Sequence, residues 1–194
     1  MKFILGSSSP RRKELLKKYG LRFTVLKPGI DEIPKKGETP EDFVKRAACD
    51  KLNAIIKKPG KGVIRDRVII TADTIVVLKR KILGKPRDEK EAFLMLKSLQ
   101  NRWHIVYTCF CIYYKGRRIC KLVKTSVRFR PLSDKEIKEY ISSGEPMDKA
   151  GAYAAQDKGA SIIKEIKGSY TNVVGLPMAE LIDELKKLKI QPEF

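Results

Sequence analysis

Apolar residues recur every three to four positions in several stretches of the chain, which is the period of an amphipathic helix. Ser9 followed by Pro10 suits the N-terminus of the first such stretch, and Ser133 is a suitable N-cap for a later one. The pattern predicts helices at residues 9–19, 39–57, 88–99, 133–142 and 177–188, with the sequence KKPGKG at 57–62 ending the second.

Other stretches alternate between apolar and polar residues or are continuously apolar, which predicts strands. The run RVIITADTIVVL at residues 67–78 is consistent with a strand pair or with one long strand. Residues 102–132 form two alternating stretches around a Lys-Gly-Arg turn, which indicates a β-hairpin. Shorter strands are predicted at residues 2–6, 23–26, 162–166 and 170–174.

Helices interspersed with a long hairpin predict an α/β protein with a mixed sheet rather than a purely parallel one. One segment does not fit a simple connection between a helix and a strand. The glycine-rich sequence SGEPMDKAGAYAAQDKGAS at residues 143–161 is longer than such a connector needs to be. Its length predicts a functional role.

The net charge of the chain indicates an anionic binding partner. The 194 residues include 42 Lys and Arg against 23 Asp and Glu, a formal charge of +19. This balance attracts nucleic acid, nucleotides or an acidic membrane surface and does not choose among them. No apolar run reaches the roughly 18–20 residues that span a bilayer, and Met1 leads straight into a strand without a signal peptide. We therefore expect a cytoplasmic protein.

The cysteines suggest no disulfide or metal framework. Cys49, Cys109, Cys111 and Cys120 lack C-x-x-C spacing, and one His is too few for a usual zinc site. Cys109 and Cys111 are alternate residues on one face of a predicted strand. Reduced thiols, as in the cytosol, are the expectation.

The loop after the first strand contains an apparent contradiction. Arg11 and Arg12 lie in the first turn of a helix, where the helix dipole disfavours cations by roughly 0.3–1 kcal/mol each. A polyanion bound to the backbone N–H groups and hydroxyls near Ser8 explains them; exposed basic residues on a capped helix are the alternative. The spacing of a phosphate-binding Walker A loop is missing.

Asp73 and Lys51 are polar residues in apolar patterns. Alternation places Asp73 on one strand face with Ile69 and Val77, where a carboxylate is costly unless it is paired or binds a metal. A bulge that Asp73 caps is the alternative. Lys51 follows the helical spacing of Val44, so it points inward to meet a phosphate or carboxylate, or else extends its ammonium to solvent.

Several loop residues are weaker candidates. Glu32, with Asp73, supplies carboxylates of the kind that bind Mg²⁺, although an exposed acidic turn fits the spacing equally well. Lys85 is held extended by the following proline, and Gln156 has the donors and acceptors to read a base edge. His104 is a possible catalytic base, but a lone His in such a run is more often structural.

Taken together, the stretches GSSSPRRKELL, GIDE, DK at 50–51, TADTIVVL, LGKP, SGEPMDKAGAYAAQDKG and GSYTNVVGLP resemble the Maf family of nucleoside triphosphate pyrophosphatases. They follow in order from residue 6 to 177. The resemblance implies a Maf/ITPase-like fold, an elongated mixed sheet flanked by helices, with two lobes around a central cleft in a single domain over residues 1–194. It also implies a divalent metal, Mg²⁺ or Mn²⁺, and a homodimer.

The resemblance assigns roles by motif. Asp73 matches the family's catalytic acidic residue, which acts as the proton acceptor, with Glu32 and Asp73 as metal ligands. The matching substrate and phosphate-binding positions are Ser8, Arg11, Arg12, Lys51 and Lys85. Arg11, Thr74 and Gln156 match the specificity positions of the branch that hydrolyses dTTP and UTP to the monophosphate and diphosphate. A small residue precedes Gln156 where many relatives have a bulkier one, and Gln-Asn replaces a usual Ser-Gly at 100–101.

The rival hypothesis is a basic protein that binds nucleic acid, or senses a nucleotide, without catalysis. The charge supports it. No nucleic-acid-binding motif or series of stacking aromatics accompanies that charge, which argues against nucleic acid as a specific partner.

Overall fold

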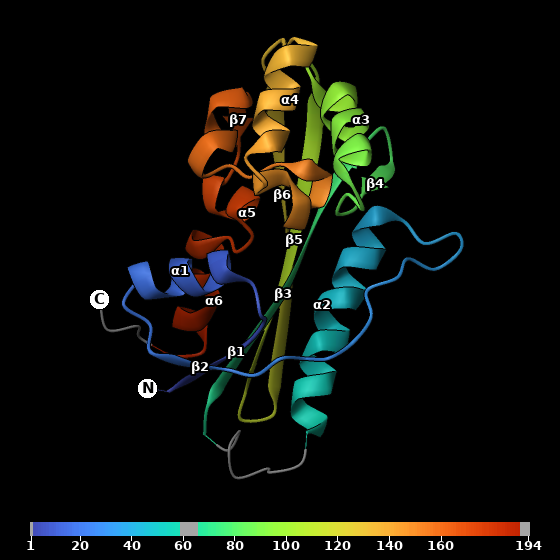
Figure 1. Ribbon diagram of the computed structural model, residues 1–194. Helices are drawn as coiled ribbons and strands as arrows, with labels where there is room; N and C mark the ends of the chain where they lie inside the picture. The colour runs from blue at the N-terminus through green and yellow to red at the C-terminus, as the bar shows by residue number, and fades with distance from the viewer. Residues whose placement is uncertain (1, 59–65, 191–194) are drawn as a thin grey trace. The chain divides into compact units, whose positions relative to one another are not determined.

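The computed structural model describes residues 2–58 and 66–190 (Figure 1). Within them the strands form a seven-stranded sheet of order β2-β1-β3-β5-β6-β7, with β4 paired to β3. The strands are β1 (Phe3–Gly6), β2 (Phe23–Val25), β3 (Val68–Leu78), β4 (Lys81–Leu83), β5 (Trp103–Tyr114), β6 (Arg117–Phe129) and β7 (Ile163–Lys167). β1 is parallel to β2 and β3, whereas β4 and β7 run antiparallel to their neighbours, so the prediction of a mixed sheet is confirmed.

The helices lie close to their predicted ranges. They are α1 (Pro10–Lys18), α2 (Pro40–Lys57), α3 (Glu89–Leu99), α4 (Asp134–Ser142), α5 (Tyr170–Val174) and α6 (Met178–Lys187). Side-chain oxygens of Ser9, Thr39, Asp88 and Ser133 accept hydrogen bonds from first-turn N–H groups, which is why the first four helices begin where they do. Residues 59–62 of the expected stop after α2 lie outside the described residues.

One predicted strand is wrong. Residues 170–174 form the short helix α5, although Thr and Val favour strands. The backbone N–H of Asn172 donates to Ser169 Oγ, and its side-chain amide donates to Thr125 Oγ1 at 2.9 Å and to the Val106 carbonyl at 3.1 Å. These tertiary hydrogen bonds outweigh a weak local propensity. The run at 67–78, left open above, is the single long strand β3.

The chain divides into two compact units. The first contains the described residues of 1–73, 108–123 and 175–194, and the second contains residues 74–107 and 124–174. β3, β5 and β6 each contribute to both units.

In the first unit the strands lie between α2 on one side and α1 with α6 on the other (Figure 1). Thr71 Oγ1 on β3 donates to the Ala48 carbonyl of α2 at 2.9 Å. On the opposite face, Lys121 of β6 donates to Glu184 of α6 at 3.0 Å. The largest fully buried side chains of this unit are Phe110, Ile4, Leu5, Leu16, Leu52, Ile55, Ile69, Ile70 and Ile112.

The second unit has its own core, in which α3, α4 and the glycine-rich segment pack on the strand ends. That segment is not an open loop. It folds into the 3₁₀ turns η2 (Glu145–Asp148), η3 (Ala150–Ala152) and η4 (Asp157–Ile162). Glu145 ties it together by accepting from the N–H groups of Lys158 and Gly159 and from the Tyr140 hydroxyl.

His104 belongs to this second core. Its Nε2 lies 2.7 Å from the Tyr153 hydroxyl, and its ring meets Phe129 edge-on with centroids 4.9 Å apart. Burial lowers the pKa of His104 to about 4, against a smaller opposite effect of the Arg102 backbone. A neutral, enclosed imidazole supports the structural interpretation.

The expectation of reduced cysteines is wrong for one pair. Cys111 and Cys120 form a disulfide across the β5–β6 hairpin, while Cys49 and Cys109 are free. The hairpin pairing brings the two Cα atoms to 4.1 Å despite a sequence separation of nine. That proximity depends on strand register, which cysteine spacing alone does not reveal.

Candidate active site

The candidate residues of the first unit gather at the carboxyl ends of its parallel strands. β1 ends at Gly6, which pairs with Thr71 of β3. The chain then enters the serine loop before α1, and Asp73 lies two residues further along β3. The connection after β2 contains Glu32 and leaves from the same edge. Ligands of open α/β sheets bind at this edge, because the loops that follow parallel strands meet there.

Asp73 is the central group of this site. It lies within unbroken β3 with 5% of its surface exposed, so the bulge that would have made it a turn cap is absent from the strand. Lys51 Nζ donates to Asp73 Oδ1 at 2.8 Å and to the Ala72 carbonyl at 3.3 Å. The same ammonium lies 2.7 Å from Glu32 Oε1. Lys51 is itself buried, so its ammonium does not extend to solvent.

The pKa values of the two carboxyl groups are shifted in opposite directions. Burial opposes ionisation of Asp73, but Lys51, a hydrogen bond with Glu32 and the charge of Arg12 together hold its pKa below the ordinary value. Burial, followed by its interactions with Asp73, raises the pKa of Glu32 despite the opposing effect of Lys51. Asp73 is therefore the more acidic member of the pair.

The contacts of Arg12 explain why one of the two arginines is tolerated in the first turn of α1. Its side chain is buried; Nε donates to the Gly175 carbonyl at 2.8 Å and Nη1 donates to Ser7 Oγ at 3.0 Å. Burial lowers the pKa of Arg12, while the charges of Asp73 and Glu32 raise it. Hydrogen bonds and these two carboxyls compensate the helix dipole at this residue.

The neighbouring residues differ in exposure. Arg11 is half-buried and Ser8 is exposed in the same loop. Ser7, in the serine run that the sequence marks as a possible anion site, is buried and also accepts from the N–H of Ser9 at 3.2 Å. The role of Gly175, which binds Arg12 through its carbonyl, was not predicted, because a backbone acceptor has no residue-specific signal.

Three candidates belong to the second unit. Thr74 is half-buried and follows Asp73 on β3. Lys85 is exposed between β4 and α3, next to buried Pro86, and Gln156 is half-buried directly before η4. The structure thus brings together Arg12, Glu32, Lys51 and Asp73 in the first unit. Thr74, Lys85 and Gln156 belong to the second unit.

The carboxylates fit a divalent metal. Oxygens of Glu32 and Asp73 lie within 2.8 Å of the same Lys51 Nζ, so they converge on one point. Converging carboxylate oxygens are the donors that Mg²⁺ and Mn²⁺ prefer. In this structure the Lys51 ammonium compensates the negative charge of Glu32 and Asp73, as a bound metal ion would.

A mixed sheet with a buried, ionised carboxylate and buried cations at its carboxyl edge defines an α/β protein equipped to bind an anionic substrate. The chain belongs to the Maf family, since the family described as Maf-like protein matches residues 2–188.

Its relatives share most of its length. A protein of Pelotomaculum thermopropionicum named dTTP/UTP pyrophosphatase is 46% identical over 186 residues, covering 95% of each chain. Proteins with the same name from Neisseria gonorrhoeae and Geobacter sulfurreducens are each 44% identical, covering 97% and 96% of this chain and 94% and 96% of their own. The Ham1 protein of Staphylococcus aureus shares the fold, with a TM-score of 0.52 at 14% identity over 97% of this chain and 100% of its own.

Among the described residues, the helices are all too short or too polar to cross a bilayer.

Proposed function

We propose that this chain hydrolyses dTTP and UTP to the nucleoside monophosphate and diphosphate (pyrophosphate). Its relatives at 44–46% identity are named dTTP/UTP pyrophosphatases. Such an activity is a hydrolysis of a phosphorus-containing anhydride and serves to maintain the nucleotide pool. Modified relatives of these nucleotides are further candidate substrates, and the cytoplasm is the expected location.

The observation that supports the proposal is the buried ion pair of Asp73 and Lys51, whose ammonium also contacts the more exposed Glu32. Because Asp73 is ionised, it can accept a proton from a water that attacks the α phosphorus. A bound triphosphate brings negative charge near Asp73, which raises the pKa of this carboxylate and makes it a stronger base. Base catalysis of this kind contributes roughly 10²–10⁴-fold in rate.

The cations of the site would bind the phosphates. Lys51 can turn from the carboxylates to a phosphate oxygen, and Arg11 lies in the first turn of α1 beside the backbone N–H groups of the serine loop. We assign Ser8, Arg12 and Lys85 to the same task on the family motif.

Glu32 and Asp73 would hold the divalent metal, Mg²⁺ or Mn²⁺. When bound, such an ion neutralises charge on the triphosphate and on the departing pyrophosphate. Lys51 would then be released from its two carboxylate partners for substrate binding.

Substrate choice is assigned to Arg11, Thr74 and Gln156. The amide of Gln156 offers both a donor and an acceptor, as recognition of a thymine or uracil edge requires. One family match spans both compact units, so we infer that they are the two lobes of a single domain over residues 1–194. A homodimer is also proposed.

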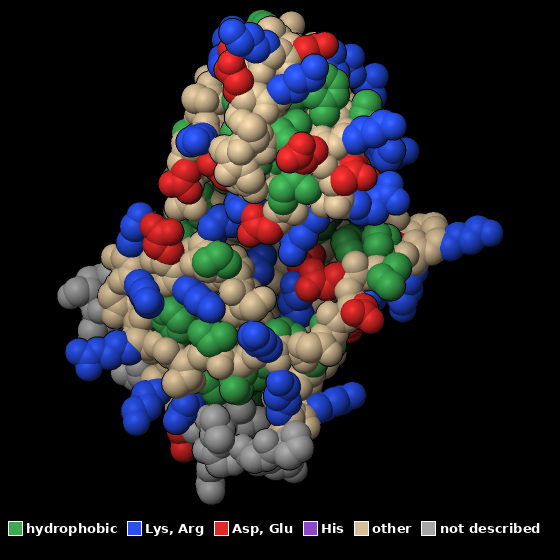
Figure 2. Space-filling view, viewed as in Figure 1, with side chains coloured by type: hydrophobic (Ala, Val, Ile, Leu, Met, Phe, Trp, Pro, Cys, Tyr) green, Lys and Arg blue, Asp and Glu red, His purple; other side chains and the backbone are tan. Residues whose placement is uncertain are grey.

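Figure 2 bears on the rival hypothesis of a nucleic-acid-binding protein. Lys and Arg side chains are scattered over the visible face with Asp and Glu among them, rather than gathered into one basic stripe. A dispersed charge is weaker support for a nucleic-acid track than a continuous one.

Incubation with dTTP and Mg²⁺, followed by an assay of dTMP and pyrophosphate, tests the proposal. We expect equal amounts of both products and no phosphate release, with loss of turnover after chelation. Salt-sensitive RNA binding without hydrolysis would favour the rival. Tight dTTP binding without hydrolysis would indicate a sensor.

A further inference from the structure

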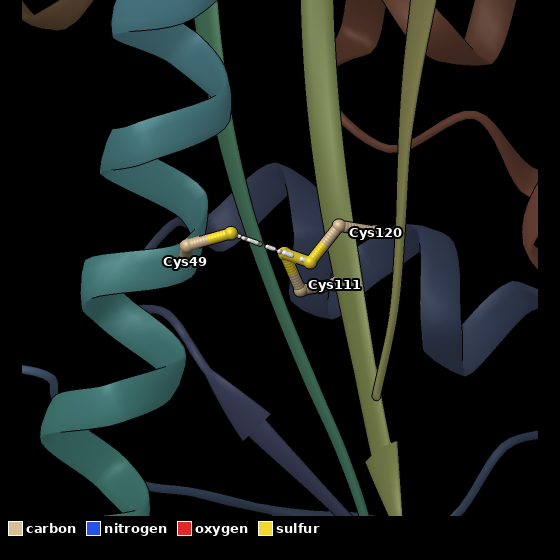
Figure 3. A group of neighbouring side chains, drawn as sticks. All are labelled: Cys49, Cys111 and Cys120. Atoms are coloured by element: carbon tan, nitrogen blue, oxygen red, sulfur yellow. Dashed lines mark hydrogen bonds between the residues drawn. A yellow bond between two sulfur atoms is a disulfide. The ribbon is translucent and has the colours of Figure 1, made fainter. Parts of the chain in front are cut away.

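Three cysteines from separate elements of the first unit meet in one cluster. Cys49 projects from α2 toward Cys111 of β5 and Cys120 of β6, as Figure 3 shows. Cys49 Sγ lies 3.6 Å from Cys111 Sγ and 3.4 Å from Cys120 Sγ. All three sulfurs lie within 4.8 Å of one another. The active-site residues described above are not part of this cluster.

The fold, rather than the disulfide, holds these sulfurs together. Cys111 and Cys120 oppose each other because β5 and β6 form a hairpin. The hairpin is tied to α2 by a hydrogen bond from Arg118 to Asn53 Oδ1 at 2.7 Å, one helical turn after Cys49. Reduction of the disulfide should therefore leave three thiols close together.

Two chemical uses of such a cluster can be compared. In thiol–disulfide exchange, Cys49 would attack the Cys111–Cys120 bond as a thiolate. Burial raises the pKa of the Cys49 thiol, with Arg118 opposing and Asp50 adding to the effect, so Cys49 is a poor nucleophile at neutral pH. A bound metal ion has no such requirement, because it displaces the thiol proton on binding.

We propose that the reduced Cys49, Cys111 and Cys120 bind a thiophilic cation, Zn²⁺, through three thiolate sulfurs with a fourth position open to water. Zn–S bonds of about 2.3 Å place sulfurs roughly 3.8 Å apart in a tetrahedral site. The 3.4 and 3.6 Å separations from Cys49 are close to that spacing. Arg118, whose charge acts on Cys49, compensates the excess negative charge of three thiolates.

The oxidation state of Cys111 and Cys120 determines whether this site can bind a metal ion. A phosphine or dithiol reductant supplies two electrons to the Cys111–Cys120 bond, and each sulfur takes up one proton as the reductant is oxidised. Zn²⁺ then displaces up to three thiol protons to solvent. In the oxidised protein two of the three ligands are consumed by the disulfide, so the site is closed.

The binding site can be detected with Co²⁺ as a probe, because thiolate-bound cobalt has a sulfur-to-metal charge-transfer absorption that carboxylate-bound cobalt lacks. Reduced, metal-free protein is titrated with Co²⁺ without oxygen, and Zn²⁺ is then added. We expect the absorption to appear with one equivalent, to vanish on Zn²⁺ addition and to be absent from oxidised protein. Asp73→Asn should retain it, which separates this site from the proposed catalytic metal site.

Substitutions assign the ligands. Cys49→Ser, Cys111→Ser and Cys120→Ser should each weaken binding more than about 100-fold, because even outer-sphere partners contribute roughly 10–100-fold. Cys109→Ser is the matched control, since Cys109 is on the same strand and outside the cluster, and it should bind as wild type. Circular dichroism confirms that each variant is folded, and alanine replaces serine where it is not. Absence of the absorption from reduced wild type, or its loss in Cys109→Ser, overturns the proposal.

Discussion

The ammonium of Lys51 lies 2.8 Å from Oδ1 of Asp73, and both side chains are buried. The two residues come from α2 and β3 and are separated by 22 positions in the chain. Each makes the burial of the other tolerable, because an isolated buried charge is far more costly than a hydrogen-bonded pair. Glu32 shares the same ammonium, so the site combines two carboxyl groups with one cation.

Replacing Asp73 by Asn should reduce kcat for dTTP by about 10²–10⁴-fold, because the amide cannot accept the proton of the attacking water. Binding of dTTP should remain, measured by calorimetry. Asp183→Asn, an exposed residue of α6 in the same unit, is the control and should retain wild-type turnover. Near-normal turnover in Asp73→Asn would sink the assignment of this residue as the base.

Replacing Lys51 by Met leaves two carboxyl groups facing each other without a cation. We expect a loss of about 3–5 kcal/mol in the free energy of unfolding, the range for breaking one side of a buried ion pair. Adding Asp73→Asn should recover part of this loss, which urea denaturation would measure. Lys45→Met, on an exposed part of α2, should change stability by less than about 0.5 kcal/mol. Simple additivity of the two active-site substitutions would contradict the coupling.

Replacing Gln156 by Leu tests the specificity assignment. If its amide recognises the base, kcat/KM for dTTP and UTP should fall by roughly 2–10-fold per hydrogen bond lost, through KM more than kcat. The ratio of kcat/KM for dTTP over dCTP should fall with it. An unchanged ratio would show that Gln156 does not select the base.

His104 makes stability depend on pH. Its pKa is about 4 in the folded protein against an ordinary value of 6.5, so the unfolded chain binds the proton more tightly. The contribution of His104 to the free energy of unfolding is fully present above pH 6.5 and is lost as pH falls toward 4. Between pH 7 and pH 5 the loss is about 2 kcal/mol. Since the chain has one His, His104→Gln should lack this slope in denaturation curves. An equal slope in both proteins would assign it to other groups.

Gly6 is required where β1 meets β3 and α2. A Cβ at this position would lie 2.6 Å from Thr71 Cγ2 and 3.1 Å from Ile55 Cγ1. Gly6→Ala should therefore destabilise by about 1–3 kcal/mol, as overpacking does. Thr71→Ser removes the clashing methyl and keeps the hydroxyl bonded to Ala48, so it should partly rescue Gly6→Ala in thermal melts. Gly84→Ala, with open space at its Cβ, is the control; an equal effect there would refute the steric explanation.

Much of the fold follows from local pattern. α2, α3 and α4 begin at Thr39, Asp88 and Ser133 because these side chains cap free N–H groups, and such caps depend on neighbouring residues alone. The hairpin between β5 and β6 follows in the same way from alternation and a Lys-Gly turn. The strand predicted at residues 170–174 was wrong because hydrogen bonds from Asn172 to residues more than 40 positions away stabilise a helix there.

For the site, the sequence by itself determined that Asp73 and Lys51 were out of place in apolar patterns and that Arg11 and Arg12 opposed a helix dipole. Only the tertiary structure decided how these charges are compensated. It paired Lys51 with Asp73 and Glu32, gave Arg12 the Gly175 carbonyl, and brought Cys49 to Cys111 and Cys120. The physical reason is that periodicity reports which way a side chain points, whereas a partner distant in sequence is fixed by strand register and helix packing.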